Sequence, residues 1–114
     1  MLSVTKDIGR LYENLVFLQL RRKFKEIFYF KQNQEVDFCF YNADKKIELI
    51  NVCFSLSDNS AKVREMNGLQ EAMSALNIDY GILINNNLEE DLMIGNTTIK
   101  IIPLWKWLTK FKTY

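Results

Sequence analysis

Asp37, Asn51 and Cys53 are the residues whose types and spacing best suit chemistry in this sequence. Side chains alternate between the two faces of a strand, so Asp37 should share a face of one predicted strand with Glu35, and Asn51 a face of the next with Cys53. If these strands pair, the side chains lie beside one another, and Glu13 reaches them from a preceding helix. The sequence contains no His, so a metal site would need carboxylates, carbonyl oxygens or the two thiols.

The composition excludes most other kinds of active site. Without His there is no Ser–His or Cys–His nucleophile pair. No GxxxxGK[ST] motif is present, so nucleotide binding through a P-loop is excluded, and the four glycines are isolated. Cys39 and Cys53 lie in apolar runs without a CxxC pair, which favours two reduced core residues over a disulfide. With neither a signal peptide nor about 20 consecutive apolar residues, we expect a cytoplasmic protein without membrane contact.

The elements that must position these residues follow from the spacing of apolar side chains and from β-branched and aromatic runs. In chain order they are a helix at 7–24, strands at 26–30, 35–41 and 46–56, a helix at 61–76, a strand at 80–85, an acidic loop at 86–96, a strand at 97–102 and a helix beginning at Pro103. The order α-β-β-β-α-β-β-α requires a crossover, so we expect one α/β domain over residues 1–114, with a mixed central sheet flanked by helices.

Two of these helices have apolar stripes that we expect to face the core. The stripe of the first helix comprises Leu11, Leu15, Leu18 and Phe24, widened by Tyr12, Val16 and Leu20. In the closing helix we expect Leu104, Trp105, Leu108 and Phe111 to pack inward and Trp107 to be the more exposed tryptophan.

Charge is distributed unevenly along the chain, although the net charge is only +1. Residues 1–31 carry +4, residues 32–99 carry −7 and residues 100–114 carry +4. The plain interpretation is a set of solvated helix faces. If both basic helices lie beside the same sheet edge, a phosphate-binding strip is the alternative.

The sequence resembles the C-terminal domain of predicted archaeal and bacterial AAA+ ATPases, a domain of the restriction-endonuclease-like, or PD-(D/E)XK, type. The resemblance covers nearly the whole chain, and an Ile-rich strand running into Pro-Leu-Trp-Lys-Trp-Leu is its most specific part. The matching segments are GRLYENLVFLQLRR at 9–22, EVDFCF at 35–40, LINVCFSL at 49–56, REMNGLQEAM at 64–73 and IKIIPLWKWL at 99–108.

The resemblance implies a role for each position of the nuclease signature. Glu13 matches the first-helix acid and Asp37 the hairpin acid, and in active members two or three carboxylates hold Mg²⁺ while a lysine assists the attacking water. This chain has Asn51-Val52-Cys53 where Glu/Asp-x-Lys is expected, which removes one carboxylate and the amine. Glu35 is a candidate second carboxylate.

Candidate replacements for the missing amine are Lys31, Lys46 and Gln70, and the sequence does not select among them. The structural alternatives are a solvated or ion-paired Glu13, a hydrogen-bonded Asp37 and a satisfied buried amide at Asn51.

We therefore expect a catalytically degenerate, nuclease-like accessory domain without its own ATPase module and without a required cofactor. It would act through contact with an AAA+ ATPase module, with a second copy of itself or weakly with the DNA backbone. Two alternatives stay open. One is a divergent Mg²⁺-dependent DNA nuclease using Glu13, Asp37 and Glu35, and the other is a homodimeric interaction module built on the aromatic C-terminal helix.

Overall fold

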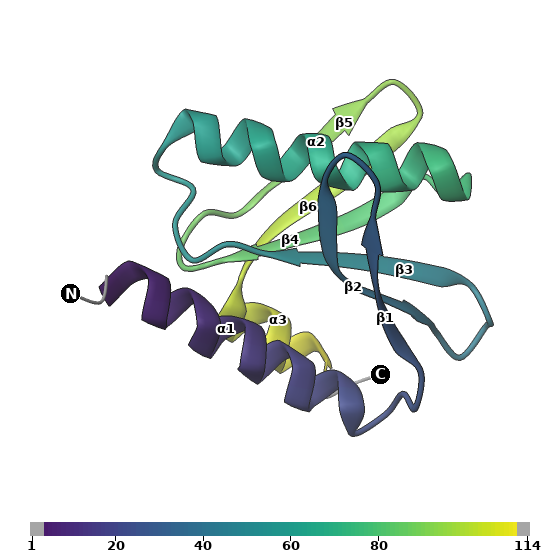
Figure 1. Ribbon diagram of the computed structural model, residues 1–114, viewed down its shortest axis with the longest axis horizontal. Helices are drawn as coiled ribbons and strands as arrows, with labels where there is room; N and C mark the ends of the chain where they lie inside the picture. The colour runs from purple at the N-terminus through teal and green to yellow at the C-terminus, as the bar shows by residue number, and fades with distance from the viewer. Residues whose placement is uncertain (1–3, 112–114) are drawn as a thin grey trace.

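A six-stranded mixed sheet with helices on both faces forms the part of the chain described by the computed structural model, residues 4–111, with side chains placed for residues 7–110 (Figure 1). In chain order the elements are α1 (Val4–Arg21), β1 (Ile27–Lys31), β2 (Glu35–Tyr41), β3 (Ile47–Val52), α2 (Asn59–Leu76), β4 (Tyr80–Asn85), β5 (Glu90–Ile94), β6 (Thr97–Pro103) and α3 (Leu104–Phe111). The predicted α/β class is confirmed.

The strand order across the sheet is β1-β2-β3-β4-β6-β5. Strands β1, β2 and β3 pair antiparallel, whereas β3, β4 and β6 run parallel. Parallel neighbours need a crossover, and α2 supplies the one between β3 and β4. The N-cap of α2 is Asp58, whose carboxylate accepts the Ser60 N–H at 3.0 Å.

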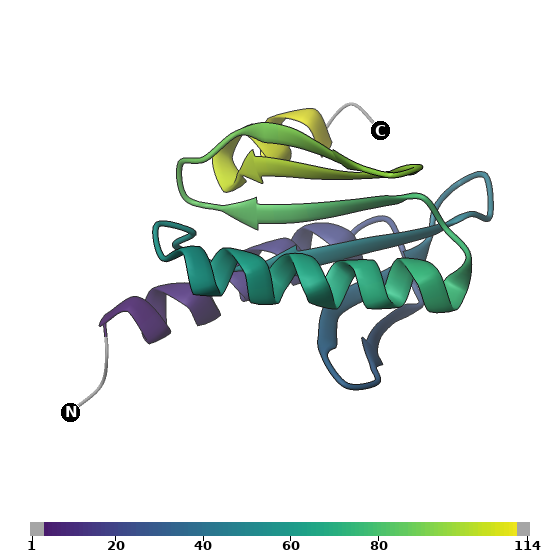
Figure 2. The same ribbon diagram turned by 90° about the horizontal axis from the view of Figure 1, so that it is seen from above.

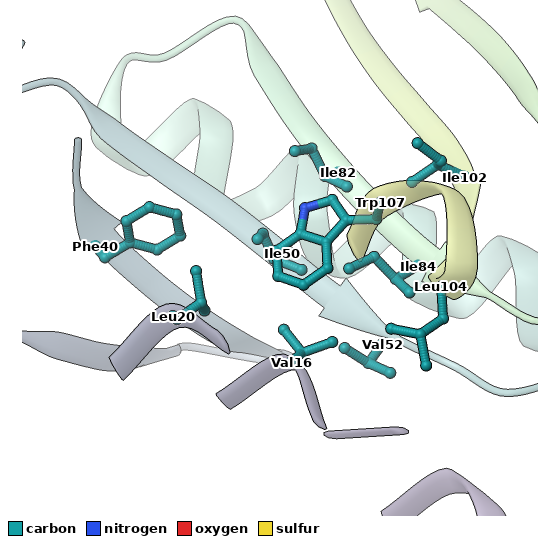
Figure 3. Close-up of a cluster of buried hydrophobic side chains, with 10 residues drawn as sticks. All are labelled: Val16, Leu20, Phe40, Ile50, Val52, Ile82, Ile84, Ile102, Leu104 and Trp107. Carbon is teal, nitrogen blue, oxygen red and sulfur yellow. The ribbon is translucent and has the colours of Figure 1, made fainter. Parts of the chain in front are cut away.

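Figure 2 shows the sheet and its helices from above. Two clusters of buried hydrophobic side chains lie between the sheet and these helices. On one face α1 and α3 pack side by side, and Figure 3 shows Trp107 of α3 lying over Ile50 and Ile82 of the sheet. On the other face α2 packs through Leu69 and Met73. The central strands β3, β4 and β6 are therefore mostly buried, as expected for parallel strands, whereas the edge strands β1 and β5 are largely exposed. None of the helices in residues 4–111 is long and apolar enough to cross a membrane.

Residues 86–96 differ from their predicted state, because this segment contains β5 instead of being loop throughout. Strand β5 pairs antiparallel with β6, and the connecting turn includes Gly95 at φ 60°, a left-handed conformation that glycine adopts without strain. Asp91 forms an ion pair with Lys100 of β6 at 3.2 Å. The acidic side chains therefore lie on β5, an edge strand, where charged residues disfavour pairing with a further strand.

The exposure of the two tryptophans is the reverse of the prediction. Trp107 is 3% exposed and Trp105 is 66% exposed. Pro103 ends β6 and does not open the helix, so α3 begins at Leu104 and its inward face runs through Leu104, Trp107 and Leu108. The sequence prediction placed the wrong tryptophan on this face.

The buried face of α1 also differs from the predicted stripe. Val16 and Leu20 are fully buried, and Tyr12 packs edge-on against Phe54 with ring centroids 5.2 Å apart. Leu11 and Leu18 are instead 54% and 58% exposed. Phe24 lies beyond the end of α1, and the six other apolar side chains of the predicted stripe cover too wide an arc of the helix for one contact, so tertiary packing selects one part of the arc.

Candidate functional site

Asp37 and Asn51 lie where strands β2 and β3 separate. Backbone pairing between these strands extends from Tyr41 opposite Ile47 to Phe38 opposite Ile50. Beyond that point, hydrogen bonds from backbone N–H groups to side-chain oxygen atoms connect the two strands. The Asp37 N–H donates to Asn51 Oδ1, and the Val52 N–H donates to Asp37 Oδ2, both at 2.8 Å. The predicted proximity of Asp37 and Asn51 is confirmed.

Asn51 also connects this point to helix α2. Its Nδ2 donates to Glu65 Oε2 at 3.0 Å and to the Glu65 carbonyl oxygen at 3.5 Å. Asn51 is only 1% exposed, and both its oxygen and its nitrogen have partners. Of the readings considered for Asn51, the satisfied buried amide is the one that these contacts match.

Gly68 lets α2 approach the two strands closely. A Cβ atom at this position would lie 3.2 Å from the Glu35 carbonyl oxygen and 3.6 Å from Asn51 Nδ2. One turn further along α2, Glu71 Oε1 accepts the backbone N–H groups of Asn33 and Gln34 at 2.9 and 3.2 Å. The β1–β2 turn is therefore fastened to α2, which fixes the start of β2 and with it Asp37.

The electrostatics of the site are dominated by two partly buried acids, Asp37 and Glu65, and by the more exposed Glu13. Burial raises the pKa of Asp37 to about 7, aided by the charges of Glu13, Glu65 and Glu35, although the Val52 N–H opposes the shift. Burial also raises the pKa of Glu65, with Arg64 opposing and Glu13 reinforcing the change. For Glu13, partial burial raises the pKa and Arg10 opposes it. The charges of Glu13 and Glu65 therefore act on Asp37, and the charge of Glu13 acts on Glu65.

A cleft of about 500 Å³ opens beside this cluster and is lined by Asn33, Gln34, Glu35, Asp37, Arg64 and Glu65. Glu35 lies at its exposed rim and forms an ion pair with Lys31 at 3.6 Å. Arg64 is the cation in the lining. The cleft therefore places a guanidinium, rather than a lysine amine, beside Asp37 and Glu65.

Cys53 provides no substitute for the expected lysine. Its Sγ donates to the Ser55 carbonyl oxygen at 3.3 Å, and burial, then the nearby Glu65, raises its pKa. Lys46 and Gln70 line a different cavity of about 950 Å³. Of the three candidate replacements, Lys31 forms an ion pair with Glu35 at the exposed rim of the cleft.

The oxygen atoms here do not fit a magnesium site as they are arranged. Among residues 4–111, no group of three or more Cys, Asp or Glu side chains is positioned to hold a metal ion. Asp37 Oδ2 and Asn51 Oδ1 already accept backbone N–H groups. The arrangement ties two strands to a helix, and we derive no metal-dependent step from it.

Sequence reasoning missed three residues of the site, namely Glu65, Gly68 and Glu71. They occur at i, i+3 and i+6 on α2, a spacing that places them along one side of the helix. The signal was present in the segment REMNGLQEAM, where two acids flank a glycine at equal distances. A glycine lowers helix propensity, so its presence inside a helix can mark a position of close packing, which is the case at Gly68 but not at Gly9.

Comparison with known proteins places this arrangement in a family. An uncharacterized protein of Methanocaldococcus jannaschii is 39% identical over 117 residues, an alignment that covers 93% of this chain and 26% of that protein. The chain thus spans about a quarter of the length of this curated relative. Residues 8–107 match the family described as "Domain of unknown function (DUF4143)", and they include both the site and the two helices beside it. The chain belongs to this family.

Proposed function

We propose that this protein is a catalytically degenerate domain of the nuclease-like type that serves an AAA+ ATPase system through contact with protein or with the DNA backbone. The proposal starts from the resemblance carried by Glu13, Asp37 and the segment at 99–108. The mixed sheet, with its first acid on α1 and its second on β2, is compatible with it.

One observation carries the degenerate reading. Asn51, at the position of the expected second carboxylate, is buried and fully used in holding Asp37 and Glu65. The next signature position, Cys53, has a thiol bonded to the Ser55 carbonyl oxygen. Neither residue supplies the negative ligand or the cation that phosphodiester hydrolysis would require here.

Contact with DNA is supported by the placement of the basic helices. Helices α1 and α3 lie side by side, which brings the two basic helices together on one face of the sheet instead of along the sheet edge considered from the sequence. Exposed basic side chains occur on α1 and in the connection to β1, namely Arg10, Arg21, Arg22, Lys23 and Lys25. Such side chains attract DNA phosphates, and their binding releases counterions from the DNA.

Association with an ATPase is supported by the resemblance and by the length of the relative. In the Methanocaldococcus protein the matched segment is about a quarter of the chain, so the domain accompanies a much longer polypeptide there. Sequencing the genomic region around the present gene tests the association. We expect a neighbouring or continuous reading frame with a GxxxxGK[ST] motif, and its absence would count against the ATPase partner.

A cleavage assay tests the degenerate reading. We expect no hydrolysis of single- or double-stranded DNA in Mg²⁺ or Mn²⁺. Cleavage that Asp37→Ala abolishes and the control Asp44→Ala preserves would overturn this reading, because Asp44 is an exposed acid in the β2–β3 turn. Such activity would support a divergent nuclease, the candidate favoured by the charges of Glu13 and Glu65 acting on Asp37.

Rebuilding the signature provides a positive test. The double change Asn51→Glu with Cys53→Lys restores the two groups that the resemblance calls for. We expect the rebuilt protein to gain metal-dependent nuclease activity that Asp37→Ala removes. A folded but inactive double variant would argue against the nuclease-like origin of the site.

DNA contact has its own measurement. We expect binding at low ionic strength that weakens linearly with the logarithm of the salt concentration. The variants Arg22→Ala and Lys23→Ala should each reduce the slope by roughly one. The control Lys62→Ala, on α2 at the other face of the sheet, should leave the slope unchanged. Absence of binding at low ionic strength would remove the electrostatic proposal.

A further inference from the structure

Helix α1 has a second apolar surface that does not face the sheet. We call it the α1 stripe, and it consists of Ile8, Leu11, Leu15 and Leu18. The three leucines are exposed, and Ile8 is half-buried. Among residues 4–111, no other helix or strand lies on the side of α1 that points away from the sheet (Figure 1). An exposed row of leucines of this length is unusual on a surface that meets only water.

The spacing of the α1 stripe is that of a coiled-coil contact. Its members are separated by three, four and three residues, which is the alternation of the a and d positions of a heptad. The buried face of the same helix follows a different row through Tyr12, Val16 and Leu20. The α1 stripe is therefore additional to the core contact and available to another helix.

A row of polar residues beside the α1 stripe, which we call the polar edge, indicates which helix packs against the stripe. Asp7, Asn14 and Arg21 are seven residues apart, so they lie along one side of the α1 stripe, at the positions next to its a residues. All three are exposed. Along the polar edge the charge is negative at Asp7, neutral at Asn14 and positive at Arg21. Arg21 Nη1 donates to the Lys25 carbonyl oxygen, and the guanidinium has five N–H donors in all.

This order of charges is self-complementary in an antiparallel pair. When α1 packs against a second α1 running in the opposite direction, Asp7 of each copy faces Arg21 of the other, and Asn14 faces Asn14 at the two-fold axis. In the same register Leu11 lies opposite Leu15, and Ile8 opposite Leu18. A parallel pair places identical residues at the same level and offers no such attraction between Asp7 and Arg21.

We propose that the α1 stripe is the interface of a two-fold symmetric homodimer in which two copies of α1 pack antiparallel. A two-fold interface uses the same surface on both subunits, which matches the self-complementary edge. Two heptads make a contact at the small end of specific interfaces, below about 1,200 Å², so the dimer should be weak and depend on concentration. The proposal is independent of the nuclease-like site.

Analytical ultracentrifugation of the full chain tests the interface. We expect the wild-type protein to shift from monomer to dimer as its concentration rises. Leu15→Glu should abolish the shift, because it places a charge in the middle of the α1 stripe. The control Val63→Glu introduces the same charge at a residue that is 46% exposed on α2, and it should leave the dimer intact. Circular dichroism confirms that each variant is folded.

A charge exchange tests the antiparallel geometry. Asp7→Arg and Arg21→Asp should each raise the dissociation constant of the dimer by about three- to tenfold, because each creates two like-charge contacts. The double variant should restore wild-type association. A wild-type protein that stays monomeric at high concentration overturns the proposal. So does a dimer that survives Leu15→Glu, or one that the double charge exchange does not restore.

Discussion

Asp37 and Asn51 connect strands β2 and β3 through their side chains at the point where backbone pairing between the strands ends. Each contributes one hydrogen bond of 2.8 Å, from the Asp37 N–H to Asn51 Oδ1 and from the Val52 N–H to Asp37 Oδ2. These two hydrogen bonds lie beyond the last backbone pair of β2 and β3, and Asn51 also donates to Glu65 of α2. Substitutions at these positions should therefore alter folding stability directly.

The first prediction concerns the pH dependence of stability. The ordinary pKa of Asp37 is 3.8 and the folded-state pKa is about 7, so between about pH 4 and pH 7 the folded protein binds a proton that the unfolded chain does not. The stabilisation from this proton is present below about pH 4 and is lost as the pH rises through about 7. One pKa unit corresponds to about 1.4 kcal/mol, so the change amounts to a few kcal/mol.

Urea unfolding from pH 4 to pH 8 measures this effect, with Asp37→Asn as the reference protein. An asparagine oxygen still accepts the Val52 N–H, so the variant should fold but lack the titration. The free energy of unfolding of the wild type, relative to Asp37→Asn, should fall as the pH rises. A difference that is constant across this range would show that Asp37 does not titrate as expected.

The second prediction compares two helical glycines. Gly9 in α1 has no neighbouring atom within 4 Å of a Cβ, so Gly9→Ala should stabilise the protein by about 1 kcal/mol through helix propensity alone. At Gly68 the added Cβ meets the Glu35 carbonyl oxygen at 3.2 Å. Gly68→Ala should therefore destabilise it by about 1 kcal/mol, because overpacking exceeds the gain in propensity.

Thermal and urea unfolding of both variants checks the pair. Since the chemical change is identical, the two effects differ only through the surroundings of each glycine. Stabilisation by Gly68→Ala would mean that α2 does not rest against the start of β2.

The sequence predicted the sheet side of the site better than its helix side. Side chains along a β-strand alternate between the two faces of the sheet. Asp37 could therefore be expected beside Asn51, on the condition that the two strands pair. The rotation of a helix about its axis depends on what packs against it, which a single sequence does not reveal. Glu65 and Glu71 were missed for this reason.

The same physics explains the errors at the two ends of the chain. Helix α1 has apolar residues over more than half of its circumference, and hydrophobic spacing alone did not distinguish Val16 and Leu20 from Leu11 and Leu18. In α3, a start at Leu104 puts Trp107 on the inner face.

The extra strand β5 was missed because its acidic residues resemble a loop by composition.

The third prediction concerns Glu71 and the β1–β2 turn. Glu71→Ala removes the carboxylate that accepts the N–H groups of Asn33 and Gln34. We expect a loss of about 1–2 kcal/mol in the free energy of unfolding and faster hydrogen exchange at these two amides. The exposed Asn67→Ala on the same helix serves as the control. Unchanged exchange in Glu71→Ala would contradict the role assigned to this carboxylate.

The fourth prediction separates the two tryptophans of the chain. Trp107 lies between α1, α3 and the sheet, so Trp107→Ala should cost about 3–5 kcal/mol in the free energy of unfolding (Figure 3). Trp105→Ala removes a side chain that is mostly in solvent and should change stability by less than about 0.5 kcal/mol.

Fluorescence of Trp105→Phe, which retains Trp107 as the single tryptophan, reports on burial without removing any core residue. Its emission should resist quenching by acrylamide in the folded state and become accessible on unfolding. The wild type should show a readily quenched component from Trp105. Equal quenching of the two proteins would place both tryptophans in the same environment and contradict the packing of α3 through Trp107.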